Sequence, residues 1–277
     1  MIALATCAEF ASLDADDALL QAALGGEAVP VVWDDPAVDW AAFDLVVVRS
    51  TWDYTERRDE FVTWAESVGP RLHNPPEVIR WNSDKRYLAD LDAAGLPVVP
   101  TTFLEPDAPL VLGGWDQVPC VVKPAVSAGS RDTARHDHPR AAAEHAQRLL
   151  ADGRVVMVQP YVPEVDTAGE TALLYYDGHF DHAIRKGPML LGGTAAVDGL
   201  FAPEAIEPRE PRPQERAVGD AVVAEIERRF GRLLYARVDL LGSEPVVLEV
   251  ELTEPSLFFG RSAGAADRYA AAIRARL

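Results

Sequence analysis

Three carboxylates in the last part of the chain are spaced so that they can meet on one face of a β-sheet. Glu249 and Glu251 lie two residues apart in one apolar run, and Asp239 lies in the run before it, beyond a turn at Gly242-Ser243. Residues two apart on a strand point to the same side of the sheet. Clustered carboxylates repel one another unless a cation lies between them, and Mg²⁺ prefers oxygen ligands of this kind. The pattern therefore predicts a magnesium site, although a solvated acidic sheet edge would have the same spacing.

Two lysines precede segments that could surround phosphate groups. Lys123 ends an apolar run and is followed by a loop of small residues that includes Ser127, Gly129 and Ser130. An ammonium and several backbone N–H groups in such a loop can bind phosphate oxygens, but the spacing is not that of a P-loop. A lysine that merely ends a strand before a turn would look the same. Lys85 stands at a predicted helix start, where the helix dipole disfavours a cation, and it gains meaning only beside the other segments.

Two further segments could contact organic ligands. Residues 159–164, Gln-Pro-Tyr-Val-Pro-Glu, leave a predicted strand and have the composition of a purine-binding hinge, although the segment taken alone favours an ordinary strand-to-loop exit. The second segment follows the apolar run at 44–49, which predicts a strand covered on both faces, and loops in this position often hold ligands. It could bind an amino acid by stacking and through its ammonium, or its aromatic residues could pack between lobes. This candidate substrate loop consists of Ser50, Thr51, Trp52, Asp53 and Tyr54.

The elements that must position these residues follow from the hydrophobic pattern. Strands alternating with helices up to residue 82 predict a parallel α/β lobe. Ser83 predicts the N-cap of a helix over 84–94, after a linker or turn at 73–76. Later runs predict a hairpin around Asp177-Gly178, two final strands and a closing helix, while the Gly- and Pro-rich segment 187–213 predicts a mobile loop. We therefore expect lobes at 1–82, 83–158 and 159–277.

Composition restricts the class of protein. The chain has 277 residues, which is more than one small core needs, and a formal net charge of −18. Such an acidic surface disfavours binding to nucleic acid or to an anionic membrane. The two cysteines, Cys7 and Cys120, lie in apolar runs and are expected to be buried thiols. No signal peptide and no run long enough to span a membrane is apparent, so we expect a cytoplasmic protein.

Taken in order, these segments resemble the ATP-grasp superfamily over residues 84–255. Within it the chain is similar to the glutathione synthetase and RimK-like ligases. It is more narrowly similar to the group that contains the O-ureidoserine cyclo-ligase of cycloserine biosynthesis. The phrases that carry this narrower likeness are Arg49–Tyr54, His182–Lys186 and Glu251–Pro255.

The resemblance implies a role for each segment. The residues implied to contact ATP are Lys85, Lys123, Ser127, Gly129, Ser130, Gln159, Tyr161, Val162 and, at the ribose, Glu164 or Asp166. Those implied to hold Mg²⁺ are Asp239, Glu249 and Glu251. Those implied to act on the transferred phosphoryl group are Arg237, Arg185 and Lys186. Many relatives end this motif with Glu-x-Asn, and the additional carboxylate of Glu251 could favour two metal ions.

The implied fold is of the α/β class, an ATP-grasp fold in which a Rossmann-like parallel lobe precedes two lobes that clasp ATP. The implied function is a ligase that activates a small carboxylic acid, such as an amino acid, as an acyl phosphate. An amine then displaces the phosphate, by coupling or by cyclisation, and the narrower likeness implies a place in antibiotic biosynthesis. Two alternatives stay open: a phosphotransferase and a non-catalytic ATP-binding regulator. The expected partners are small molecules, with a homodimer left open.

Overall fold

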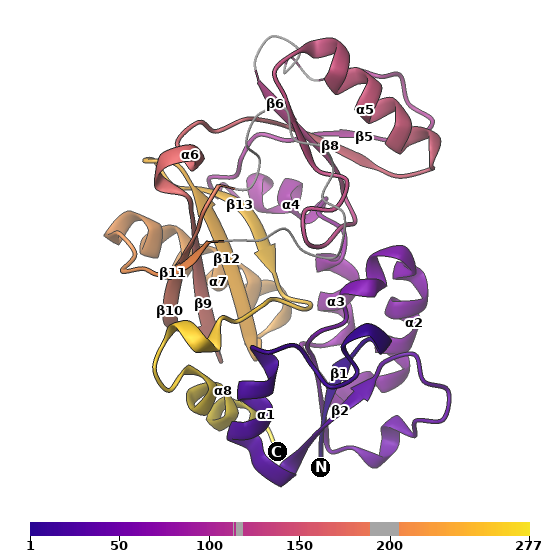
Figure 1. Ribbon diagram of the computed structural model, residues 1–277, viewed down its shortest axis with the longest axis vertical. Coiled ribbons are helices and arrows are strands. Elements are labelled where there is room, and N and C mark those ends of the chain that lie inside the picture. Colours follow the sequence, from indigo (N-terminus) through magenta and orange to yellow (C-terminus); the bar gives the residue numbers. More distant parts are fainter. Residues whose placement is uncertain (113, 115–118, 189–204) are drawn as a thin grey trace.

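The computed structural model describes residues 1–112, 114, 119–188 and 205–277, which form three β-sheets with helices around them (Figure 1). The larger part of the loop expected at 187–213 lies outside the described residues. The mixed α/β class expected from the sequence is confirmed, because the first sheet is parallel and the other two are antiparallel.

The first sheet is a parallel four-stranded sheet in the order β2-β1-β3-β4. Its third strand is fully buried, as its unbroken apolar run predicts. The strands are β1 (Ile2–Thr6), β2 (Ala28–Val32), β3 (Leu45–Val48) and β4 (Leu72–His73). The helices of this part are α1 (Asp17–Leu24), α2 (Arg58–Val68) and α3 (Pro76–Asn82). The short 3-10 turns are η1 (Ala8–Phe10), η2 (Gly25–Glu27), η3 (Trp40–Ala42), η4 (Trp52–Glu56) and η5 (Gly69–Arg71).

The predicted helix over 84–94 begins later than expected. Ser83 is the C-cap of α3, which the sequence analysis missed, and the next helix is α4 (Tyr87–Ala93). Pro76 occupies the first turn of α3, where a missing N–H costs nothing. Between the two helices, the backbone N–H of Lys85 donates to the carbonyl of Ala125. This bond fixes Lys85 against the loop that follows Lys123, so the interruption of the helix positions a site residue.

The second sheet is antiparallel, in the order β5-β8-β6-β7, and α5 (Pro139–Ala151) packs against it. Its strands are β5 (Thr102–Leu104), β6 (Cys120–Pro124), β7 (Ala134–His136) and β8 (Val156–Pro160). Because β8 continues to Pro160, it crosses the lobe boundary expected between residues 158 and 159. The expected division into three lobes otherwise stays a prediction.

The third sheet is antiparallel, in the order β11-β10-β9-β12-β13, and α7 (Pro213–Phe230) packs against it. Its strands are β9 (Glu170–Tyr176), β10 (His179–Lys186), β11 (Ile206–Pro208), β12 (Tyr235–Leu241) and β13 (Val246–Glu251). The short α6 (Val165–Ala168) precedes β9, and η7 (Phe259–Arg261) precedes the last helix, α8 (Ala265–Arg274). The predicted hairpin and the pairing of the last two strands are confirmed.

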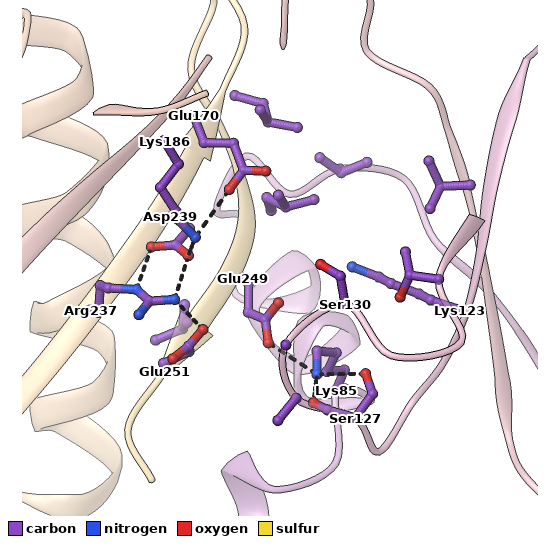
Figure 2. A pocket seen from close by; sticks show the side chains of 18 of the residues that line it. Lys85, Lys123, Ser127, Ser130, Glu170, Lys186, Arg237, Asp239, Glu249 and Glu251 are labelled. Atoms are coloured by element: carbon purple, nitrogen blue, oxygen red, sulfur yellow. Dashed lines mark hydrogen bonds and ion pairs between the residues drawn. The ribbon is translucent and has the colours of Figure 1, made fainter. Parts of the chain in front are cut away.

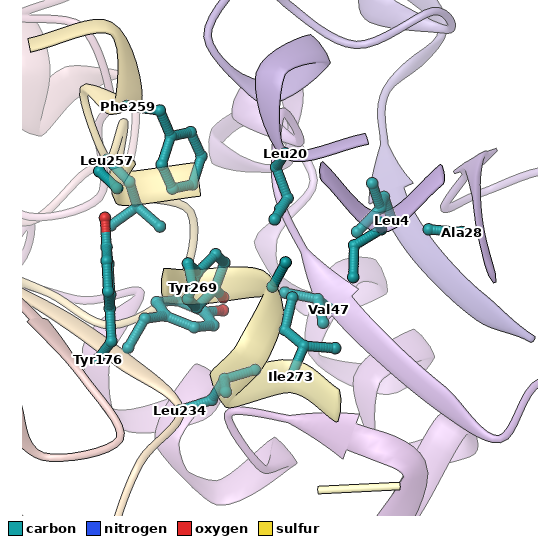
Figure 3. Packing of buried hydrophobic residues seen from close by; sticks show 14 of the residues in the cluster. Leu4, Leu20, Ala28, Val47, Tyr176, Leu234, Leu257, Phe259, Tyr269 and Ile273 are labelled. Atoms are coloured by element: carbon teal, nitrogen blue, oxygen red, sulfur yellow. The ribbon is translucent and has the colours of Figure 1, made fainter. Parts of the chain in front are cut away.

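The last helix connects the third sheet to the first. Tyr269 and Ile273 of α8 pack in one buried cluster with Leu4 and Leu20 of the first lobe and with Tyr176 of β9 (Figure 3). This shared core fixes the first sheet against the third.

Both cysteines are free and buried, as expected. Among the described residues, no helix is long and apolar enough to cross a membrane.

Candidate active site

A cavity of about 290 Å³ lies where the three sheets meet, and its wall is densely charged (Figure 2). The acidic residues of the wall are Glu170, Asp239, Glu249, Glu251 and Glu254. The basic residues are Lys85, Lys123, Lys186 and Arg237. Four separate segments that the sequence analysis singled out therefore meet in one place.

Asp239 on β12 is held between two cations. Lys186 Nζ lies 2.6 Å from Asp239 Oδ2, and Arg237 Nε donates to Asp239 Oδ1 over 2.9 Å. Burial alone would raise the pKa of Asp239, but the charges of Arg237 and Lys186 hold it below its ordinary value. Lys186 also pairs with Glu170, which lies directly opposite it on β9 at 3.2 Å. The network therefore keeps a buried carboxylate ionised.

The two glutamates of β13 face the same cavity but have different partners. Glu249 pairs with Lys85 at 3.1 Å, and Lys85 Nζ also donates to the carbonyl of Ser127 over 2.6 Å. Glu251 accepts a hydrogen bond from Arg237. Burial, together with the charges of Glu249 and Asp239, outweighs that contact and raises the pKa of Glu251 to about 7.

The predicted metal site is not preassembled. Within the described ranges, no group of three His, Cys, Asp or Glu side chains is arranged to hold a metal ion. Asp239, Glu249 and Glu251 contact lysine or arginine instead, although Glu249 and Glu251 each keep one carboxylate oxygen without a partner in the part described. Hard oxygen donors of this kind fit Mg²⁺. The residues therefore suit the ion in chemical type.

Lys123 is a buried cation without an anionic partner. Its side chain is 7% exposed, and no carboxylate of the described chain lies within 4.0 Å of its Nζ. Burial lowers its pKa. The loop of Ser127, Gly129 and Ser130 lines the cavity beside it, and Gly129 and Ser130 both have positive φ angles, which turn the backbone sharply. A lysine of this kind is free to meet an anionic ligand.

The hinge residues Gln159, Tyr161 and Val162 line the cavity as expected, and Gln159 Nε2 donates to Thr101 Oγ1. The two carboxylates expected at a ribose do not line it. Glu164 and Asp166 are exposed. Asp166 instead accepts a hydrogen bond from the Tyr161 hydroxyl.

Only one of the two basic residues at the end of β10 reaches the cavity. Lys186 lines it, whereas Arg185 donates to the carbonyls of Ala168 and Thr167 over 2.8 and 3.1 Å. Neighbouring residues on a strand point to opposite faces of the sheet, so both could not enter the site. The structure thus does not support the suggestion that Arg185 assists the reaction.

Only some residues of the candidate substrate loop line the cavity. Trp52 and Tyr54 line the cavity, while Ser50 and Thr51 are fully buried and do not. Asp53, which we expected to meet an ammonium group, is absent from the wall. Its carboxylate instead accepts from Trp33 Nε1 at 2.9 Å and from Arg57 at 3.0 Å.

The sequence analysis missed several residues of the wall. Glu254 and Phe258 follow β13, Asn82 ends α3, and Glu170 begins β9. Glu254 lies inside the phrase Glu251–Pro255 that carried the family likeness, so its position was singled out but its role was not. Glu170 could have been found from the hairpin register, which sets it opposite Lys186.

Comparisons with known proteins bear on what this cavity does. Residues 2–74 match the family model described as D-cycloserine synthetase DcsG, N-terminal domain. The chain is 41% identical over 263 residues to the cycloserine biosynthesis protein DcsG of Streptomyces lavendulae, covering 88% of this chain and 87% of the relative. This chain belongs to the DcsG family. The crystal structure of D-cycloserine synthetase DcsG superposes with a TM-score of 0.89 at 39% identity, over 99% of both chains.

More distant structures show the fold that the DcsG family shares. D-alanine–D-alanine ligase of Bacillus anthracis, complexed with ATP, has a TM-score of 0.70 at 16% identity, covering 99% of this chain and 98% of the other. A RimK domain ATP-grasp protein of Sphaerobacter thermophilus has a TM-score of 0.67 at 20% identity, covering 99% and 100%. The fold is the ATP-grasp fold. This DcsG-family member is an ATP-dependent, ADP-forming ligase with small-molecule substrates, which confirms the function expected from the sequence. The expected homodimer stays a prediction.

Proposed function

We propose that this ligase activates the carboxylate of a small amino acid as an acyl phosphate and then closes a ring by forming a carbon–nitrogen bond. The observation that carries the proposal is that one cavity contains both the cations suited to ATP and the aromatic residues of the first lobe. The cations are Lys123 and Arg237, which is paired with Asp239, and the aromatic residues are Trp52 and Tyr54. The 41% identity to a cycloserine biosynthesis protein supports the ring-forming version.

ATP would bind with its phosphates at Lys123 and the neighbouring loop. Lys85 is already held against this loop by its bond to Ser127, so the two ammonium groups would bind different phosphate oxygens. The hinge at 159–162 would contact the adenine, because it lines the same cavity. The unpaired charge of Lys123 supports this assignment, since a buried cation without a counter-ion is costly until an anion arrives.

The phosphoryl transfer brings two anions together. A carboxylate oxygen of the substrate attacks the γ-phosphorus, the bond to the bridging oxygen breaks, and ADP leaves. Arg237 is the cation best suited to stabilise the charge that develops, because its guanidinium lies in the wall between Asp239 and Glu251. Lys186 would hold Asp239 ionised and in position during this step.

Asp239, Glu249 and Glu251 would hold one or two Mg²⁺ ions when nucleotide binds. The ion would supply charge neutralisation at the phosphate oxygens. The ion pairs of the wall support this assignment, because Lys85, Lys186 and Arg237 already contact carboxylates and so offer little free positive charge to a polyanionic nucleotide.

The second step forms the carbon–nitrogen bond. A nitrogen of the same substrate attacks the acyl carbon, the carbon–oxygen bond to phosphate breaks, inorganic phosphate leaves, and the nitrogen releases its proton. Water would hydrolyse the acyl phosphate, so exclusion of water from the cavity during turnover would favour the ligase reaction. Intramolecular attack needs no second binding site for an amine.

The decisive experiment measures ADP release with small D- and L-amino acids, including serines that bear a second nitrogen on the side-chain oxygen. Hydroxylamine should trap the acyl phosphate as a hydroxamate in the presence of ATP and the active substrate. Mass spectrometry should then find a product lighter than the substrate by one water. ADP release without any hydroxamate would contradict acyl-phosphate formation. A product equal in mass to two joined molecules less water would replace cyclisation by intermolecular coupling.

A further inference from the structure

Glu254 is the acid of the wall that lacks a cationic partner among the residues that the structure describes. Its four acidic neighbours in the cavity each lie within 4.0 Å of a lysine or arginine nitrogen. In the described part of the chain, no lysine, arginine or histidine nitrogen lies that close to Glu254, although its side chain is only 8% exposed. Burying a carboxylate without a counter-charge is unfavourable. The fold therefore favours the neutral acid here and does not itself stabilise the ionised form.

The surroundings of Glu254 are suited to a small organic cation. Tyr54 and Glu254 line the same part of the wall, and burial followed by the charge of Glu251 raises the pKa of the Glu254 carboxyl to about 8. Trp52 and Phe258 line the same cavity. Aromatic rings attract an ammonium group and exclude water from it, which strengthens its contact with a carboxylate.

The other acidic side chains near the first lobe already have hydrogen-bond or ion-pair partners within the protein. Asp53 is engaged by Arg57 and Trp33 and does not line the cavity. Glu170 is engaged by Lys186 at 3.2 Å. An ammonium that enters the cavity can therefore pair with Glu254, because its charge would stabilise the ionised form of that carboxyl.

We infer that Glu254, together with Tyr54 and the aromatic side chains of Trp52 and Phe258, binds the ammonium group of the amino-acid substrate. This inference rests on the proposed function and assigns its substrate-binding residues. Glu254 would accept the charge-assisted hydrogen bond while Lys123 and Arg237 attract the anionic groups. The substrate would thus be oriented by unlike charges at different parts of the wall, which presents its carboxylate to ATP.

The test compares ligands with and without the amine. Calorimetry measures the binding of D-cycloserine, D-serine and L-serine, each against its deaminated counterpart, to the wild-type chain and to Glu254→Gln. Glutamine keeps the shape and polarity of the side chain but cannot ionise. We expect the wild type to prefer at least one amine-bearing ligand, and we expect Glu254→Gln to weaken that ligand by roughly 10–100-fold, as for loss of a hydrogen bond to a charged group. The deaminated ligands should bind both proteins equally.

Asp53→Asn is the variant for comparison, because it also removes one carboxylate and Asp53 lies in the same loop as Tyr54. Loss of amine preference in Asp53→Asn with its retention in Glu254→Gln would overturn the inference, as would a wild type that prefers no amine.

With the active substrate, Glu254→Gln should raise the KM for the amino acid and leave the KM for ATP within about twofold, whereas a fall in kcat alone would assign Glu254 to proton transfer instead. Amine-dependent binding without any ADP release would refute the proposed function and leave this inference standing. Equal melting temperatures for the variants and the wild type exclude misfolding as the cause.

Discussion

The guanidinium of Arg49, at the end of β3, donates from Nη2 to the backbone carbonyl of Pro255 over 2.7 Å. The same side chain donates from Nε to Asp17 over 2.8 Å, and both residues are buried. Pro255 follows Glu254 directly. One arginine of the first sheet therefore fixes the segment after β13 that forms part of the cavity wall.

Arg49→Met should lower the free energy of unfolding by about 3–5 kcal/mol, because it leaves Asp17 buried without a counter-charge. Urea unfolding monitored by tryptophan fluorescence measures the change. The control is Arg140→Ala, which breaks a solvent-exposed i,i+4 pair with Glu144 and should cost less than about 1 kcal/mol. Similar losses in the two variants would mean that the buried contact does not hold the lobes together.

The sequence predicted the position of some site residues but not of others. Glu249 and Asp239 were expected on one sheet face, and the register sets them directly opposite each other. Arg185 and Lys186 could not be separated, because only the register of β10 decides which side chain faces the cavity. Asp53 was expected to meet the substrate, but its contacts with Arg57 and Trp33 depend on packing that no local pattern encodes.

The fold was predictable where each element buries its own apolar face. The run at 44–49 is continuously apolar and the hairpin strands flank a turn at Asp177-Gly178, and both form as expected. The helix over 84–94 was drawn too early, because the hydrogen bond from Lys85 N–H to Ala125 is a contact between distant segments. Local helix signals cannot reveal such a bond.

Glu249→Gln should reduce turnover by roughly 10²–10³-fold while the protein stays folded, since it removes a carboxylate proposed to hold Mg²⁺. The assay is kcat for ADP release across a Mg²⁺ titration, with the free energy of unfolding measured in parallel. Glu244→Gln, an exposed residue of the turn between β12 and β13, is the control and should retain full turnover. Equal kcat values for the two variants would remove Glu249 from the metal site.

His145 should make the protein less stable in mild acid. Burial, followed by the charge of His136, lowers its pKa from 6.5 to about 4 in the folded state. The unfolded chain therefore takes up this proton first, so the contribution of His145 to stability is complete above pH 6.5 and is lost as the pH falls towards 4.

Urea unfolding of wild type and His145→Asn at pH 7 and pH 5 measures this linkage. The wild type should lose more stability than the variant between the two values, by at most about 1.4 kcal/mol per pH unit. The exposed His179→Asn is the control for loss of a histidine on the surface. Parallel pH profiles for wild type and His145→Asn would show that His145 is not held neutral by the fold.

Lys123 and Lys186 offer the sharpest contrast, because both are buried lysines of one cavity but only Lys186 has close carboxylate partners. Replacing each with methionine keeps much of the length of the side chain and removes the charge. Lys123→Met should leave the free energy of unfolding unchanged or higher, since it removes a buried charge that the fold does not neutralise. Lys186→Met should lower it by about 1–3 kcal/mol, because Glu170 loses its partner while Asp239 keeps Arg237.

The affinity for ATP should depend on Lys123 even though replacing this residue does not destabilise the fold. Lys123→Met should weaken ATP binding by roughly 10–100-fold, the loss expected for one hydrogen bond to a charged group, although the variant folds at least as well as the wild type. Calorimetric titration with ATP, set against urea unfolding of the same samples, gives both quantities. A Lys123→Met protein that binds ATP normally but unfolds readily would show that Lys123 serves the fold. The phosphate-binding role would then pass to Lys85, because its Nζ donates to the carbonyl of Ser127 in the neighbouring loop.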